Sequence, residues 1–204
     1  MRRAFALQVF WVVTIVVFAR GKEFNNQELY LLDDGVTIEF LAPGSSQSNA
    51  AYRPAFPYFS QLDPRWSDER MGKSYLQIGP SGGEFVSLTM LLGGYNFTIG
   101  GESVNPSNLN KYLLQADGWL IHGDIRWPVL WDIGFKDVGP FKAFDDVIRN
   151  LAAGNYCILA IDLHNVLAVG FSGDNYHVMD PRDQSKTTYH KKEIKEARCF
   201  VKKQ

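Results

Sequence analysis

The sequence predicts an α+β domain built from an early buried helix and a later antiparallel sheet. Apolar residues lie on nearly every side of the segment from Glu84 to Leu92, which is typical of a helix in the middle of a domain. After residue 155 the pattern changes to short β-prone runs, and Ser172-Gly173-Asp174-Asn175 separates two of them as a tight turn. Helices that precede strands in this way favour an α+β fold with an antiparallel sheet.

The composition is that of a folded globular protein. Hydrophobic residues make up 46% of the 204 residues and charged residues 21%, a balance that separates the chain from disordered tails. The length accommodates one ordinary domain with additional segments. Because the formal net charge is only -1, no basic field supports binding to nucleic acid, and we expect no nucleic-acid partner.

The N-terminal segment, residues 1–21, predicts a secretory signal or a membrane anchor. Arg2 and Arg3 precede an apolar run over residues 4–19, and a positive start followed by such a run is typical of a cleaved signal. The run is slightly shorter than the roughly 17–25 residues of a spanning helix, which favours the cleaved signal. A retained membrane tether and a buried core helix are the alternatives. A signal and a tether both place the rest of the chain outside the cytoplasm, so we expect an extracytoplasmic protein.

Residues 22–50 predict a hairpin followed by a flexible linker. Two β-prone runs between residues 28 and 41 flank Asp33-Asp34-Gly35, and an Asp-Gly turn between such runs is a hairpin signal. Residues 43–51 are rich in Gly, Ser and Asn, a composition typical of flexible linkers. The compact domain is therefore expected to span residues 51–204.

The first part of this domain is expected to contain a loop and three helices. Residues 78–81 predict the loop, and the helix over 84–92 should stop at Gly93-Gly94. A second helix should begin at Pro106-Ser107, with Ser107 as its N-cap, and continue to Leu114. A third is predicted around residues 141–152, where apolar side chains follow helical spacing.

The second part is expected to form the sheet. Strands are predicted over residues 156–161, 166–171 and 176–179. Residues 187–189 and 199–202 are predicted to add strands at its edges.

Two features concern covalent modification in an oxidising compartment. Cys157 and Cys199 both lie in strand-like apolar runs. Such a compartment permits a disulfide between them, and two separate buried thiols are the alternative. Asn96-Phe97-Thr98 is an N-glycosylation sequon, which is usable only if the protein is eukaryotic.

Three ordered segments carry a family resemblance. Residues 78–92 contain Ser81-Gly82-Gly83 ahead of the apolar helix, residues 164–170 read His-Asn-Val-Leu-Ala-Val-Gly, and Met179-Asp180-Pro181 follows. In this order and spacing they resemble the papain-like cysteine peptidases of the bacteriocin-leader-processing type (cysteine peptidase family thirty-nine). The segments 57–66, 104–113 and 157–162 extend the resemblance, which covers residues 56–181.

The resemblance implies a papain-like fold with a buried N-terminal helix packed on an antiparallel sheet. A cysteine peptidase of this kind places a thiol at the head of that helix, where the helix dipole stabilises the thiolate. A histidine accepts the thiol proton and an acid orients the imidazole. The resemblance assigns these two positions to His164 and Asp180. It assigns the thiol position to Gly83, where the family has cysteine.

Glycine at this position removes the nucleophile. Ser81 precedes the helix and Ser87 lies one turn inside it, so neither is expected to face His164. A shift of the alignment by one residue would bring in Glu84, which is no peptidase nucleophile. Gln77 and Gln61 are candidates for the glutamine that papain-like enzymes use as an oxyanion donor, Gln77 lying six residues before Gly83. An exposed loop glutamine is the alternative for each.

Metal and cofactor sites are not expected. The four histidines, at positions 122, 164, 177 and 190, form no ligand-spaced cluster with Cys or carboxylates. Residues 79–83 are rich in glycine but lack the Lys-Ser/Thr ending of a phosphate-binding loop.

The sequence therefore predicts a catalytically inactive, peptidase-like protein that is secreted or membrane-tethered. It is expected to bind a protein partner or to form part of an extracytoplasmic assembly. An active hydrolase of peptide or amide bonds with a non-standard nucleophile, or a water activated by His164, is one alternative. A peptide- or glycan-binding module is the other.

Overall fold

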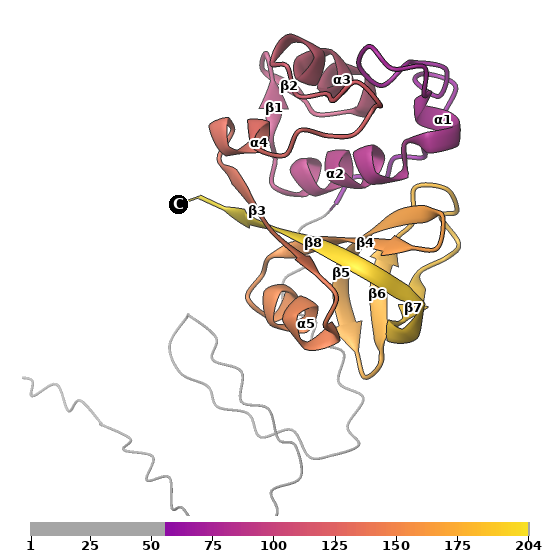
Figure 1. Ribbon diagram of the computed structural model, residues 1–204, viewed down its shortest axis with the longest axis vertical. Helices are drawn as coiled ribbons and strands as arrows, with labels where there is room; N and C mark the ends of the chain where they lie inside the picture. Colours follow the sequence, from indigo (N-terminus) through magenta and orange to yellow (C-terminus); the bar gives the residue numbers. More distant parts are fainter. Residues whose placement is uncertain (1–55, 204) are drawn as a thin grey trace, which may run out of the picture. The chain divides into compact units, whose positions relative to one another are not determined.

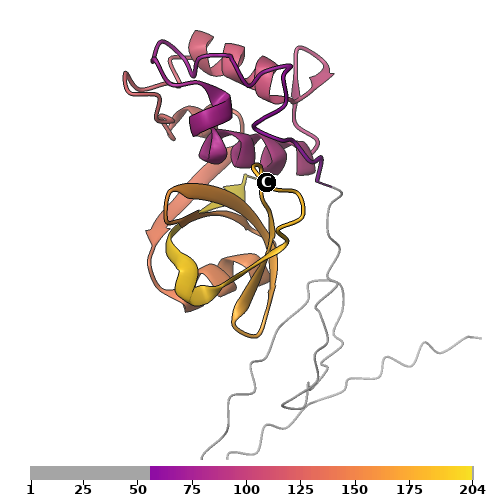
Figure 2. The same ribbon diagram turned by 90° about the vertical axis from the view of Figure 1, so that its right-hand side faces the viewer.

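The fold is known from a computed structural model, which describes residues 56–203. The predicted signal or anchor, hairpin and linker all lie outside the described residues. Helices α1 to α4 lie on one side of a six-stranded sheet and helix α5 on the other (Figure 1). Figure 2 shows the same separation from the side, with the helical part above the curved sheet. No helix within residues 56–203 has both the length and the apolar character to cross a membrane.

The segment predicted to be a loop before the buried helix is itself a short helix, α1 (Ile78–Ser81). The prediction of a loop was wrong because two backbone hydrogen bonds close a helical turn here. The Ser81 N–H donates to the Gln77 carbonyl (3.1 Å) and the Gly82 N–H to the Ile78 carbonyl (2.7 Å). Ile78 is fully buried and fixes this turn against the core.

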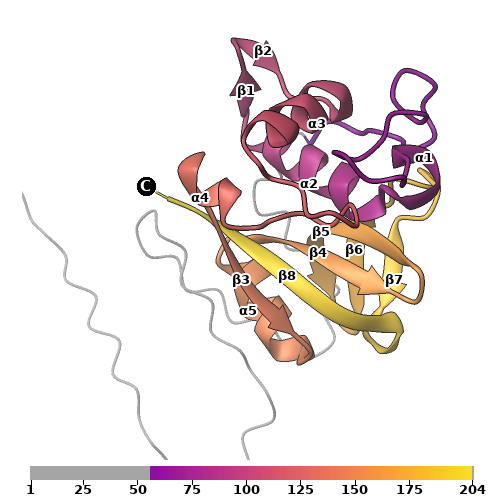
Figure 3. The ribbon, with the colours of Figure 1, turned by 45° about the horizontal axis from the view of Figure 1, so that its top comes forward.

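Helix α2 (Gly83–Gly94) is the central helix of the fold, and ten of its twelve residues are buried. Figure 3 shows it between the other helices and strands β4 and β5. At its C-terminal end, Phe56 and Pro57 pack closely against Gly94 and Gly93. A Cβ at Gly94 would lie 2.1 Å from the nearest Phe56 ring carbon, so only glycine admits the ring in this position.

Helix α3 (Pro106–Gln115) begins at Pro106, within the predicted start, but its cap is a different residue. Asn105 is the N-cap: its side chain accepts from the Asn108 N–H (3.0 Å), and the Asn108 side chain accepts from the Asn105 N–H (2.8 Å). This reciprocal pair is a capping box, made here by two asparagines. Ser107, the predicted cap, instead donates its hydroxyl hydrogen bond to Glu69 Oε1 (2.6 Å).

The sheet is antiparallel throughout, which confirms the predicted α+β class. Its strand order is β3-β8-β4-β5-β6-β7. In chain order the strands are β3 (Phe135–Phe141), β4 (Tyr156–Ile161), β5 (His164–Ser172), β6 (Asn175–Met179), β7 (Thr188–His190) and β8 (Ile194–Lys202). Strands β1 (Thr98–Ile99) and β2 (Glu102–Ser103) form a separate small hairpin, and α4 (Val129–Asp132) precedes β3.

One strand predicted at an edge lies inside the sheet. Strand β8 runs from Ile194 and pairs with β3 on one side and β4 on the other. The error follows from the missed strand β3, whose Gly139-Pro140 sequence is unfavourable in a strand. Because β3 continues to Phe141, helix α5 (Phe144–Ala152) also begins later than predicted.

Both faces of the sheet are buried. In β4, Ile158 packs with the core around α2, whereas Cys157 and Leu159 pack with the core around α5. Strand β5 alternates in the same way, with Leu167 on the first face and Val166 on the second. A strand buried on both faces reads as an apolar run, as both strands do in the sequence.

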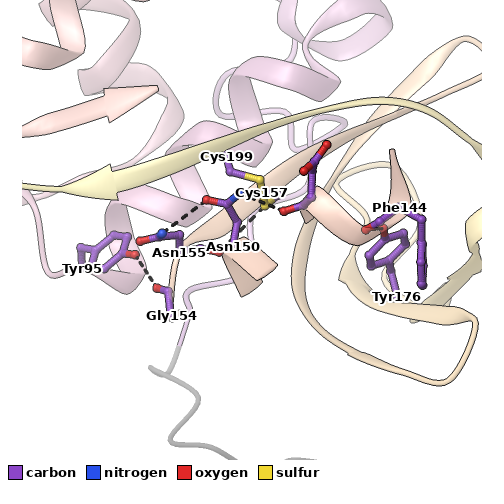
Figure 4. Close-up of a disulfide and its surroundings, with 9 residues drawn as sticks. Tyr95, Phe144, Asn150, Gly154, Asn155, Cys157, Tyr176 and Cys199 are labelled. Carbon is purple, nitrogen blue, oxygen red and sulfur yellow. Dashed lines mark hydrogen bonds between the residues drawn. A yellow bond between two sulfur atoms is a disulfide. The ribbon is translucent and has the colours of Figure 1, made fainter. Parts of the chain in front are cut away.

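Cys157 and Cys199 form a disulfide across β4 and β8, where they lie directly opposite each other (Figure 4). Both residues are fully buried on the α5 face of the sheet. The structure thus selects the disulfide from the two possibilities that the sequence left open. Asn96 is exposed in the turn after α2, and its use as a glycosylation site stays a prediction.

Candidate functional site at the head of helix α2

Gly83, the first residue of α2, lies directly against His164. A Cβ built on Gly83 would be 2.7 Å from His164 Nδ1 and 2.9 Å from its Cε1, closer than real Cβ contacts. The Asn165 carbonyl oxygen would lie 3.2 Å from the same atom. The space beside the helix N-terminus that a side chain would need is therefore already filled by the imidazole.

The preceding glycine is required by the turn between α1 and α2. A Cβ at Gly82 would lie 2.5 Å from the Ile78 carbonyl oxygen and 2.9 Å from the Ile78 Cα. Both are backbone atoms, so a side-chain rotation cannot relieve the overlap. The helix N-terminus is thus approached closely by α1 on one side and by the His164 ring on the other.

His164 is the first residue of β5 and follows a tight turn from β4, in which Ile161 pairs with it. Its side chain is only 9% exposed. The Nε2 atom lies 2.6 Å from Asp180 Oδ1. When Nε2 carries the proton it donates to this carboxylate, which leaves Nδ1 as a hydrogen-bond acceptor on the side of Gly83.

Asp180 is buried at the end of β6 and is held by four donors. Its Oδ1 accepts from His164, from the Arg182 N–H (2.8 Å) and from the Asp183 N–H (3.3 Å), and its Oδ2 accepts from the Tyr189 hydroxyl (2.8 Å). Burial alone raises the pKa of the Asp180 carboxyl. The hydrogen bonds from His164, Arg182 and Tyr189 outweigh it, and the pKa lies below its ordinary value. The carboxylate is therefore ionised at neutral pH.

Two tyrosines complete the surroundings of Asp180. The Tyr58 hydroxyl donates to its backbone carbonyl (2.9 Å) and the Tyr189 hydroxyl to its carboxylate. Burial, followed by the hydrogen bond to Asp180, raises the pKa of Tyr189, so the phenol keeps its proton and remains a donor. Sequence reasoning missed both residues. Tyr189 lies within a predicted strand, but no sequence pattern marks which side chain that strand directs at Asp180.

The structure separates the two glutamine candidates. Gln77 is exposed, and its amide donates to the Asp68 carbonyl (3.2 Å); the structure gives it no hydrogen bond to His164 or Asp180. Gln61 is fully buried: its N–H donates to the Pro181 carbonyl (2.8 Å) and its side-chain amide to the Gly79 carbonyl. Gln61 thus ties α1 to the residue after Asp180 through its side-chain nitrogen, whereas its buried Oε1 has no hydrogen-bond partner within residues 56–203.

The hydroxyl and carboxyl groups near Gly83 do not replace a thiol. Ser81 is exposed, and the buried Ser87 directs its hydroxyl to the Asn165 carbonyl (3.4 Å). Glu84, in the first turn of α2, is half-buried. Burial raises its pKa to about 7, an effect that Arg198 opposes and that Asp124 and Glu196 reinforce. These charged neighbours belong to β8 and to the loop before α4. His164 and Asp180 are not among the groups that shift the pKa of Glu84.

Within residues 56–203, the structure pairs His164 with the Asp180 carboxylate and gives its ring no hydrogen bond to a hydroxyl or a thiol. Gly83, His164 and Asp180 lie together, and their assignment as catalytic positions stays a prediction. Within residues 56–203, no group of three or more His, Cys, Asp or Glu side chains is arranged to hold a metal ion.

Comparisons with known proteins were made with the whole chain. No family model matches it, and no curated protein matches it. Among solved structures it is similar to a crystal structure described as a putative C39-like peptidase from Bacillus anthracis, with 14% sequence identity and a TM-score of 0.49. The match covers 74% of this chain and 96% of that one.

Proposed function

We propose that this protein is a catalytically inactive relative of papain-like cysteine peptidases that acts by binding a protein partner outside the cytoplasm. One observation carries the proposal: the imidazole of His164 lies where the side chain of a nucleophile at position 83 would have to be. The site therefore lacks the thiol and also lacks the space for one.

The chemistry explains why this arrangement argues against turnover. Covalent catalysis needs a nucleophile within hydrogen-bond reach of its base. Glycine offers no such atom and lets the ring approach the helix, so Nδ1 faces backbone where a thiol would be. The Asp180 carboxylate fixes the other ring nitrogen at 2.6 Å. In this proposal His164 and Asp180 stabilise the packing of the α2 N-terminus against the sheet.

The disulfide supports a location outside the cytoplasm. Structural disulfides persist in oxidising compartments and are rare where thiols are kept reduced. Cys157 and Cys199 are fully buried and paired, which agrees with the secretory signal or membrane tether proposed for residues 1–21. The partner is proposed to be a protein of an extracytoplasmic assembly, reached through the surface around the former cleft or through residues 22–50.

The first experiment measures hydrolysis by the purified full-length protein. Peptide and amide substrate libraries are incubated with wild type, His164→Ala and, as a matched control, His122→Ala, whose histidine is exposed and distant in sequence. We expect no turnover by any of the three. Turnover lost in His164→Ala but kept in His122→Ala would establish the hydrolase alternative, with water or another group as nucleophile.

A second experiment restores the thiol. The Gly83→Cys variant is expected to remain without peptide turnover, because its Cβ displaces the His164 ring and overpacking of this kind costs about 1–3 kcal/mol. Alkylation by iodoacetamide should be slow at pH 6, since position 83 is buried. Fast alkylation at pH 6 that His164→Ala slows would mean that the cleft opens easily, and would contradict the closed geometry.

A third experiment tests the partner. Chemical crosslinking in the native source followed by mass spectrometry should return the same extracytoplasmic protein repeatedly. A protein recovered only as a free monomer would favour the peptide- or glycan-binding module.

A further inference from the structure

A pocket of about 540 Å³ lies beside the His164–Asp180 pair. Its walls come from three segments: the β4–β5 turn at 161–164, the loop at 182–186, and the stretch from Tyr189 through η1 (Lys191–Glu193) to Lys195. The volume is within the range of about 300–1,000 Å³ typical of small-molecule sites. His164, Asp180 and Tyr189 form one wall of the pocket.

Four cationic side chains line this pocket: Arg182, Lys186, Lys192 and Lys195. Among the described residues, Lys195 alone of the four has a carboxylate partner, Asp162, at 3.3 Å. Lys186 lies over the Tyr189 ring, with Nζ 4.6 Å from the ring centroid. Within residues 56–203, the structure gives Arg182, Lys186 and Lys192 no ion pair.

Four carboxylates line the same pocket, so the formal charges of its cations and carboxylates cancel. Asp162 pairs with Lys195. Asp183 accepts from the N–H and the hydroxyl of Ser185 (3.0 and 2.7 Å), and Glu193 accepts from the His190 N–H (2.8 Å). Asp180 accepts from its four donors. None of these hydrogen bonds uses the side chains of Arg182, Lys186 or Lys192, so the donors of these three cations stay available to a ligand.

We propose that this pocket binds a small ligand through an oxyanion, a carboxylate or a phosphate. Charge-assisted hydrogen bonds from Arg and Lys to such groups are among the stronger polar contacts in proteins. The proposal does not depend on the missing nucleophile, because no step of it needs bond cleavage, and it goes beyond the protein-binding function proposed above.

Two kinds of ligand supply such an oxyanion: a free small acid and the C-terminal carboxylate of a peptide. Three probes distinguish them: succinate, inorganic phosphate, and a tripeptide compared with its C-terminal amide. Binding of the free tripeptide but not of its amide identifies a peptide terminus. Binding of succinate or phosphate identifies a free acid, and each of these results supports the site.

The test is a titration of the full-length protein at low ionic strength, followed by NMR of the histidine rings and by calorimetry. The ring signals of His164 should shift with saturation, whereas those of the exposed His122 should not. Lys186→Ala and Lys192→Ala should each weaken binding about tenfold, the effect of losing one charge-assisted hydrogen bond. The matched control is Lys111→Ala, an exposed lysine of α3 outside the pocket.

Two results would overturn the site. One is the absence of saturable binding by every probe. The other is an equal loss of affinity in Lys111→Ala and in the two pocket variants, which would show that only the net charge matters. Because hydrolysis is not measured, failure here leaves the proposed inactivity untouched.

Discussion

Both ends of helix α2 carry a glycine pair, and at both ends a ring lies where a Cβ would be. At the C-terminal end the ring is Phe56, 2.1 Å from the position of a Gly94 Cβ; at the N-terminal end it is His164, 2.7 Å from that of Gly83. The Phe56 ring packs against the hydrophobic core, where only apolar contacts hold it. The His164 ring is a polar group held by a buried carboxylate. Identical residues therefore accommodate an apolar ring at one end and a histidine paired with a carboxylate at the other.

The largest expected loss of stability comes from removing the disulfide, which lies at neither end of α2. It is the reference against which the losses at the two helix ends are compared. Replacing Cys157 and Cys199 by alanine opens a loop of sequence separation 42, for which chain entropy predicts a loss of about 4 kcal/mol. The disulfide lies on the α5 face of the sheet, so His164 ring signals should persist in the folded variant. Urea unfolding and NMR measure the two quantities. Loss of those ring signals in the folded variant would mean that the sheet transmits the change to α2.

Asp180→Ala tests the polar end and should cost about 3 kcal/mol, because it leaves buried donors without their acceptor. The pH dependence gives the more specific result. The pKa of Asp180 in the folded protein lies below its ordinary value of 3.8, so the ionised carboxylate stabilises the fold above that value. This stabilisation is lost as the pH falls below 3.8 through the folded pKa.

Unfolding curves recorded between pH 7 and pH 2 provide the measurement. Wild type and Asp180→Ala should differ most at pH 7, and the difference should shrink at the acidic end. A difference that stays constant with pH would show that Asp180 contributes packing and no charge.

The sequence predicted the components of the site but not their contacts. Ser81-Gly82-Gly83, His164 and Asp180 were selected because their order and spacing resemble those of the cysteine-peptidase segments. A Cβ at position 83 would lie 2.7 Å from His164 Nδ1. No sequence pattern predicts a contact distance of this kind. Tyr58 and Tyr189 were not selected because their roles arise from hydrogen bonds to Asp180, which no sequence pattern marks.

The fold shows the same limit. Strand β4 and helix α2 were predicted because burial on all sides leaves a continuous apolar record in the sequence. Strand β3 was missed because it is half-exposed and contains Gly139-Pro140, and its absence displaced β8 to an edge. The buried strands and the longer helices were found, whereas the half-exposed strand β3 and the four-residue helices α1 and α4 were not.

Gly94→Ala tests the apolar end and should lower the free energy of unfolding by about 2 kcal/mol. The added methyl group must displace the Phe56 ring, and overpacking of a core costs about 1–3 kcal/mol. The double variant Gly94→Ala/Phe56→Leu should recover part of the loss relative to Phe56→Leu alone. An unchanged stability in Gly94→Ala would mean that the chain at Phe56 yields freely.

The smallest expected effect is the coupling between positions 83 and 164, measured by a double-mutant cycle. Gly83→Ala gains helix propensity of up to about 1 kcal/mol, but its methyl group must push aside an imidazole anchored by Asp180, so the single variant should be close to neutral. In a His164→Ala background the ring is absent and only the Asn165 carbonyl oxygen remains near the methyl group, at 3.2 Å. The same substitution should then stabilise by up to about 1 kcal/mol. Chemical denaturation of the four proteins at pH 7 gives the coupling energy. A coupling of zero would place the ring away from Gly83 in solution and would remove the observation on which the proposed inactivity rests.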